Sequence, residues 1–191
     1  MTTFEVEIKF RVDDVAELER RLIPLGGTGF EEPVTESDSF FQHPGRNFEQ
    51  TDECLRLRYR VLPDGTEENS LTYKGPKIDT STKTRKEIEL PITEPEQWKS
   101  LLVALGFHQS ASVQKFRRRQ RLTVNHRDVN IVLDTLPALP ESNRLFVEME
   151  TLATEVEVEE CRTLILDIAQ QLGLSNPIRE SYLNLVQNYK G

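Results

Sequence analysis

The chain has 191 residues, a length that suits one ordinary domain with a single core. Hydrophobic residues make up 37% and charged residues 29%, so the chain has either a very polar surface or charge that lines an interior. The net charge of −8 argues against a sequence-independent nucleic-acid binder that works by whole-molecule attraction, although it leaves room for a local basic site. The apolar stretches are far shorter than the roughly 20 residues of a membrane span. We therefore expect one soluble, cytoplasmic domain over residues 1–191, without nucleic-acid or membrane partners.

Strand and helix patterns follow one another along the chain. Alternation of apolar and polar residues, which is typical of half-buried strands, predicts strands at 3–12, 54–62 and 84–92. Further strands are expected at 30–41 (extended or bulged), 70–74, 113–124, 128–136 and 144–152. Apolar residues at helical spacing predict helices at 14–25, 94–105, 154–172 and 181–189. About eight strands, mostly antiparallel neighbours, with helices after the first and fifth strands and at the C-terminus predict an α+β fold.

The polar faces of these strands are unusually rich in long ionic side chains. In the first strand Glu5, Glu7 and Lys9 alternate with the apolar Val6 and Ile8. Later strands continue the pattern with Arg56, Arg58, Lys74, Arg85, Glu87, Glu89, Lys115, Arg117, Arg119, Asp134, Glu148 and Glu150. The opposite faces, such as the one that carries Ile88 and Leu90, are apolar and require cover, which the helices can supply.

A closed barrel would turn all the charged faces into one lumen, because period-two alternation allows only two directions. Unpaired buried charge is costly, so such a lumen must hold water, a metal or a charged ligand. Carboxylates suit Mg²⁺ or Mn²⁺ and arginine or lysine suits phosphate, so together they suit a metal-bound polyphosphate. The alternative is an open sheet whose charged faces meet water; it explains any single strand well, but the whole set less well.

Seven motifs in order along the chain resemble the CYTH superfamily, the triphosphate tunnel metalloenzymes. The motifs are FEVEIK (4–9), LRLR (55–58), LTYKGP (71–76), TRKEIE (84–89), QKFRR (114–118), IVLD (131–134) and FVEME (146–150). They span nearly the whole chain. The stretches FEVEIKFRV, KGP and ESYLNLV resemble the class IV adenylate cyclase branch in particular.

The resemblance implies a closed eight-stranded antiparallel β-barrel, with helices packed outside, whose tunnel binds a nucleoside triphosphate or inorganic triphosphate with Mg²⁺ or Mn²⁺. The acids that resemble metal ligands are Glu5, Glu7, Asp134, Glu148 and Glu150, with Glu87 and Glu89 in the same set or directly behind it. The cations that resemble triphosphate ligands are Lys9, Arg56, Arg58, Lys74, Arg85, Lys115 and Arg117. Catalytic roles fall by the same resemblance on Glu5, Glu7, Lys9 and Glu148. A homodimer is compatible with the resemblance.

Three functions remain open at this point. The favoured one is conversion of ATP to cyclic AMP and pyrophosphate. The complete acid pairs Glu87/Glu89 and Glu148/Glu150 look instead like the hydrolase members, which favours hydrolysis of tripolyphosphate or thiamine triphosphate. A non-catalytic polyphosphate- or nucleotide-binding module is the third, although an anion binder has no use for carboxylates without metal. Tyr182 is expected to pack the last helix on the barrel or to border the tunnel mouth.

Overall fold

The computed structural model describes residues 4–77 and 85–190. Its strands form a closed barrel in the order β1-β5-β4-β3-β2-β6-β7-β8, and every neighbouring pair is antiparallel. The bounds are β1 Phe4–Arg11, β2 Val34–Gln42, β3 Cys54–Val61, β4 Glu67–Lys77, β5 Arg85–Ile92, β6 His108–Val124, β7 Arg127–Thr135 and β8 Leu145–Ala153. The predicted eight-stranded antiparallel barrel is thereby confirmed, and the open sheet is excluded.

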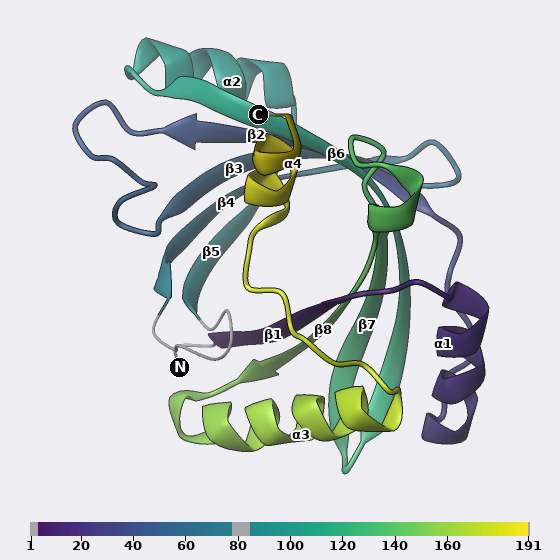
Figure 1. The fold of residues 1–191 in the computed structure, drawn as a ribbon. Coiled ribbons are helices and arrows are strands. Elements are labelled where there is room, and N and C mark those ends of the chain that lie inside the picture. Colours follow the sequence, from purple (N-terminus) through teal and green to yellow (C-terminus); the bar gives the residue numbers. More distant parts are fainter. Residues whose placement is uncertain (1–3, 78–84, 191) are drawn as a thin grey trace.

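Helices cover parts of the outer surface (Figure 1). These are α1 Val15–Leu22, α2 Pro95–Ala104 and α3 Val158–Gln171, and a further helix, α4 Tyr182–Lys190, lies near the C-terminus. The long helix α3 packs on β1, β7 and β8, where Ile8, Ile131, Met149 and Ile165 belong to one buried apolar cluster. A second cluster lies between α2 and strands β2 and β3. None of the helices in the described ranges is long and apolar enough to cross a membrane.

Helix α4 differs from the other three because it lies across the opening of the barrel (Figure 1). The segment before it crosses β1, where the backbone N–H of Ile178 donates to the Lys9 carbonyl at 2.7 Å. Val186 is buried with Phe146 of β8, and the Tyr182 ring meets Phe146 edge to face. The C-terminal segment therefore closes one end of the lumen.

Several element bounds differ from those predicted. Strand β6 begins at His108 rather than at 113, and β4 begins at Glu67 because the hairpin turn is confined to Leu62–Thr66. The predicted helix 154–172 starts as a 3₁₀ turn, in which Thr154 and Glu157 form a capping box, before α3 begins. The first residue of the predicted strand 84–92 lies outside the described residues.

The prediction that helices cover the outer face of β5 is wrong. Ile88 is 46% exposed and Leu90 is 51% exposed. Helix α2 packs against β3 and β6 while α3 packs against β1 and β8, so β5 lies between the two covered regions. Exposure of these two side chains follows from where the helices sit rather than from the strand pattern.

Candidate active site

A cavity of about 440 Å³ occupies the barrel interior, within the usual size range of small-molecule sites. Every residue to which the sequence assigned a metal, phosphate or catalytic role lines this cavity, with the exception of Asp134. The polar parity of the strands therefore predicted the direction of these side chains. A second cavity, of about 550 Å³, shares Glu5 and Glu150 with the first and extends toward the β6–β7 turn.

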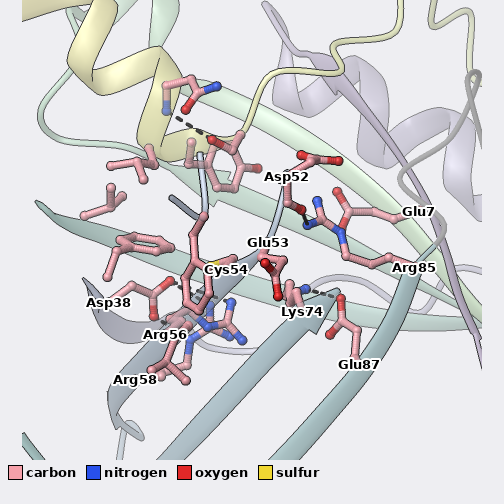
Figure 2. A pocket seen from close by; sticks show the side chains of 18 of the residues that line it. Glu7, Asp38, Asp52, Glu53, Cys54, Arg56, Arg58, Lys74, Arg85 and Glu87 are labelled. Carbon is pink, nitrogen blue, oxygen red and sulfur yellow. Dashed lines mark hydrogen bonds and ion pairs between the residues drawn. The ribbon is translucent and has the colours of Figure 1, made fainter. Parts of the chain in front are cut away.

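One wall of the cavity is a buried cluster of cations and acids. The Arg58 guanidinium donates to both Asp38 oxygens, at 2.7 and 2.8 Å. The Lys115 ammonium lies 3.2 Å from a Glu36 oxygen and 3.5 Å from an Asp38 oxygen. Cross-strand register explains the cluster, because Asp38 pairs with Arg58 on β3 and Glu36 pairs with Lys115 on β6. Figure 2 shows Asp38, Arg56 and Arg58 together on this wall.

The pKa shifts in this wall follow from burial opposed by opposite charge. Burial alone would raise the pKa of Glu36, but Arg117, Lys115 and Arg58 hold it well below its usual range. The pKa of Lys115 is lowered, first by burial and then by the neighbouring Arg117 and Arg58. The two acids are therefore ionised at neutral pH and hold several cations at one place in the lumen.

Asp134 is fully buried behind this wall and does not reach the cavity surface. Arg117 donates to both of its oxygens, at 2.7 and 2.5 Å, and also to Glu148 at 2.8 Å. Asp134 thus fixes the Arg117 fork in its planar, bidentate geometry. The metal-ligand role that the resemblance implied for Asp134 stays a prediction.

The opposite wall is rich in carboxylates. The Lys74 ammonium contacts Glu87 and lies 3.4 Å from Glu5, and the Lys74–Glu87 pair is drawn in Figure 2. Burial, the Glu5 charge and a hydrogen bond with Glu5 raise the pKa of Glu87 to about 7, although Lys74 opposes the shift. Burial and Glu5 likewise raise the pKa of Glu150 to about 7. This wall therefore holds more negative charge than its own cations balance.

A divalent cation fits the chemistry of the acidic wall. Carboxylate oxygens are the donors that Mg²⁺ and Mn²⁺ prefer. The pKa values of Glu87 and Glu150 are raised first by burial and then by repulsion from neighbouring carboxylates, and a bound cation would offset both effects. In the described part of the chain, no three acids, histidines or cysteines already converge as a metal cage. In the described residues the carboxylates therefore line the lumen separately rather than as a closed metal cage.

The C-terminal segment supplies the remaining contacts of the cavity. The Lys9 ammonium donates to the Glu180 carbonyl at 2.5 Å and lies 4.0 Å above the Tyr182 ring centroid. Burial, together with Asp134 and Glu148, raises the pKa of Tyr182 far above its usual range, so the ring is neutral. Both expectations for Tyr182 are confirmed, because it packs α4 on the barrel and also lines the cavity.

The sequence prediction missed Glu36 and Asp38. Both are buried, and both lie on the lumen face of β2 together with Phe40. Their period-two spacing is the same signal that located Glu5 and Glu7. It is obscured here because the outward residues Thr35, Ser37 and Ser39 are polar instead of apolar.

Residues 3–182 match the family model of the CYTH domain, so the chain belongs to the CYTH domain family. The chain is 33% identical over 184 residues to a Methanocaldococcus jannaschii protein named as a candidate adenylate cyclase, covering 95% of this chain and 97% of that protein. It is 26% identical over 173 residues to adenylate cyclase CyaB of Aeromonas hydrophila, covering 91% of this chain and 82% of that protein. A solved Pyrococcus horikoshii structure superimposes with a TM-score of 0.81 and 34% identity, covering 97% of this chain and 99% of that chain.

Proposed function

We propose that this chain binds ATP with a divalent metal in the barrel and converts it to cyclic AMP and pyrophosphate. The observation that carries the proposal is the arrangement of charge in the lumen. Arg58, Lys115 and Arg117, held by buried acids, lie on one wall, whereas carboxylates that include Glu5 and Glu87 crowd around Lys74 on the other. A triphosphate with its metal has the matching distribution of charge. The names of the two curated relatives, both of the adenylate cyclase type, support the same reaction.

The cations bind the phosphate chain and stabilise the charge that develops on it. Arg58 and Arg117 are held by Asp38 and Asp134, so their forks are oriented before the substrate arrives. Preorganised donors of this kind need no rearrangement as charge builds up, and loss of one such donor costs about 10²–10³ in rate. Lys115 adds a compact charge beside them.

Cyclisation requires the ribose 3′-hydroxyl in line with the α-phosphorus. The 3′-oxygen forms the new bond to the α-phosphorus, and the bond from that phosphorus to the oxygen bridging the α- and β-phosphates breaks. Pyrophosphate leaves with the bridging oxygen, and the hydroxyl proton passes to solvent water. The cationic wall lowers the barrier by fixing the chain and taking up the charge of the leaving pyrophosphate.

The acidic wall would hold the metal through Glu5, Glu7, Glu87, Glu148 and Glu150, all of which line the cavity. A bound Mg²⁺ or Mn²⁺ supplies Lewis-acid polarisation of the phosphate oxygens. Glu89 is less central, because its side chain is 56% exposed and contacts Arg56 at 3.5 Å.

Hydrolysis of a triphosphate is the second candidate function. The specific observation in its favour is that both members of the pairs Glu87/Glu89 and Glu148/Glu150 line the cavity. In that reaction water attacks the terminal phosphorus, the bond from that phosphorus to its bridging oxygen breaks, and the diphosphate part leaves while the attacked phosphoryl group becomes orthophosphate. The cationic wall serves it equally well, because phosphoryl transfer depends mainly on positioning.

Product analysis with ATP, tripolyphosphate and thiamine triphosphate, each with Mg²⁺ or Mn²⁺, separates these functions. Cyclic AMP and pyrophosphate in equal amounts are the expected products from ATP. Orthophosphate from tripolyphosphate or thiamine triphosphate, without cyclic AMP from ATP, would replace the proposal by the triphosphatase. Binding of all three compounds without turnover would leave a non-catalytic module.

A further inference from the structure

The aromatic ring of Phe40 is not accounted for by the protein core. Phe40 is partly exposed, lines the main cavity and belongs to none of the three buried apolar clusters of the described residues. Its neighbour Phe41 also borders the cavity, but it is 2% exposed and packs in the apolar cluster beneath α2. An apolar ring in a charged lumen gains nothing from that position in the free protein, so a ligand that covers it would be favoured.

Strand register places this ring beside the phosphate-binding wall. Phe40 is directly opposite Arg56 on β3, so their Cα atoms are about 5 Å apart. Asp38, which holds Arg58, is two residues earlier on the same face of β2, or about 7 Å along the strand. A nucleotide whose phosphates contact Arg56 and Arg58 would therefore bring its sugar and base toward Phe40.

The surroundings of the ring have the composition of a site for a planar heteroaromatic group. The side chains of Val113 on β6 and Leu183 on α4 line the same cavity and are apolar. Polar groups are supplied by Ser110 and by Gln187 of α4. Ser110 is the extra residue of a β-bulge, since Phe40 pairs with Ala111 and Phe41 with Gln109. Bulges of this kind redirect side chains next to binding sites.

From this placement we infer that Phe40 is the stacking platform for the base of a nucleoside triphosphate, and so determines specificity for nucleotides over inorganic triphosphate. The inference rests on the proposed function for the phosphate-binding wall. Stacking on an aromatic side chain accepts any base and is strongest for the larger purines. Gln187 then offers hydrogen bonds to the base edge or the ribose, and the Ser110 hydroxyl, which donates to the Phe40 carbonyl at 3.3 Å, can accept one.

Titration calorimetry on the whole chain with Mg²⁺ tests the inference. The two probes are α,β-methylene-ATP, which cannot be cyclised, and the bis-methylene analogue of tripolyphosphate. Phe40→Ala and Phe40→Leu should lower the affinity for the ATP analogue roughly 5- to 140-fold, the range typical of one base–aromatic stack. The affinity for the tripolyphosphate analogue should change by less than about twofold. Phe40→Tyr keeps the ring and should keep the affinity for the ATP analogue.

Phe116→Leu is the matched control, because Phe116 is on the outer face of β6 and is 42% exposed; it should change neither affinity. Unchanged binding of the tripolyphosphate analogue also shows that a Phe40 variant is folded. Three results would overturn the inference while leaving the phosphate site in place. They are an equal loss of affinity for both probes in the Phe40 variants, no loss of affinity for either probe, or an ATP analogue that binds wild type no more tightly than the tripolyphosphate analogue. If neither probe binds wild type, the proposed function itself fails.

Discussion

Neutralising Glu36 without changing its size tests whether this buried carboxylate holds the cations of the lumen together. The Glu36 side chain is fully buried, and its oxygens lie 3.1 Å from Arg58, 3.2 Å from Lys115 and 3.4 Å from Arg119. Two more guanidinium groups, of Arg60 and Arg117, lie within 4 Å. In Glu36→Gln these cations lose their shared counter-charge, and breaking a buried pair in this way costs about 3–5 kcal/mol.

That cost is large enough to measure by urea unfolding. With a slope of about 2 kcal/mol per molar urea, the midpoint should fall by roughly 1.5–2.5 M. Tripolyphosphate with Mg²⁺, added at a saturating concentration, should reduce the difference in urea midpoint between wild type and Glu36→Gln. The ligand brings negative charge to the same cations and stabilises only the folded state. The ligand-induced rise in midpoint is thus expected to be larger for the variant than for wild type.

Glu19→Gln is the matched control for this measurement. Glu19 pairs with Arg118 at 3.5 Å, but both side chains are more than a third exposed, so its loss should cost less than about 1 kcal/mol. If Glu36→Gln unfolds at the same urea concentration as the control, the cation cluster is not held by Glu36. If tripolyphosphate raises both midpoints equally, the ligand does not meet these cations.

Three further predictions concern the acidic wall, the core and a helix cap. Glu5→Gln should lower metal-dependent turnover at least about 100-fold in steady-state kinetics, because it removes a carboxylate assigned to the metal; normal turnover with Mg²⁺ would contradict that assignment. Its Tm should not fall, because after burial the Glu5 charge contributes most to raising the pKa of Glu87 and Glu150. Leu133 is 3% exposed, so Leu133→Ala should lower the free energy of unfolding, measured in urea, by about 2–5 kcal/mol. Leu90 is 51% exposed, so Leu90→Ala should lower it by less than about 1 kcal/mol. Equal losses would contradict the assignment of Leu133 to the covered face of the barrel and of Leu90 to an uncovered one. Glu157 accepts hydrogen bonds from Thr154 and Arg127, which lower its pKa from 4.5, the ordinary value for a glutamate, to about 2. The Tm of Glu157→Ala should therefore lie below that of wild type by a constant amount above pH 4.5, and this difference should vanish as the pH falls toward 2. A difference that is unchanged at pH 2 would exclude a role for the carboxylate charge.

The lumen direction of most site residues was predictable because period-two alternation is a local property. In β1 the apolar Val6 and Ile8 require the helix-covered face, so Glu5, Glu7 and Lys9 must face inward. The same reasoning located Glu148 on β8. Closure of the barrel was predictable only through the whole set of strands, since no single strand distinguishes a lumen from solvent.

Contacts that join distant strands were not predictable in this way. Asp134 has the expected parity, yet its oxygens are occupied by Arg117, which follows from the β6–β7 register. The contact of Tyr182 with Lys9 depends on the path of the C-terminal segment across the barrel mouth, which no local pattern encodes. Glu36 and Asp38 escaped because a strand with polar residues on both faces carries no alternation of hydrophobicity.

The central claim is that the triphosphate lies inside the barrel between the two charged walls. A crystal structure with α,β-methylene-ATP and Mn²⁺ tests it most directly. We expect phosphate oxygens within hydrogen-bond distance of Arg58, Lys115 and Arg117, with Mn²⁺ bound by carboxylates that include Glu5. A nucleotide bound on the outer surface, with the ion pairs of the lumen unbroken, would show that the triphosphate does not bind inside the barrel.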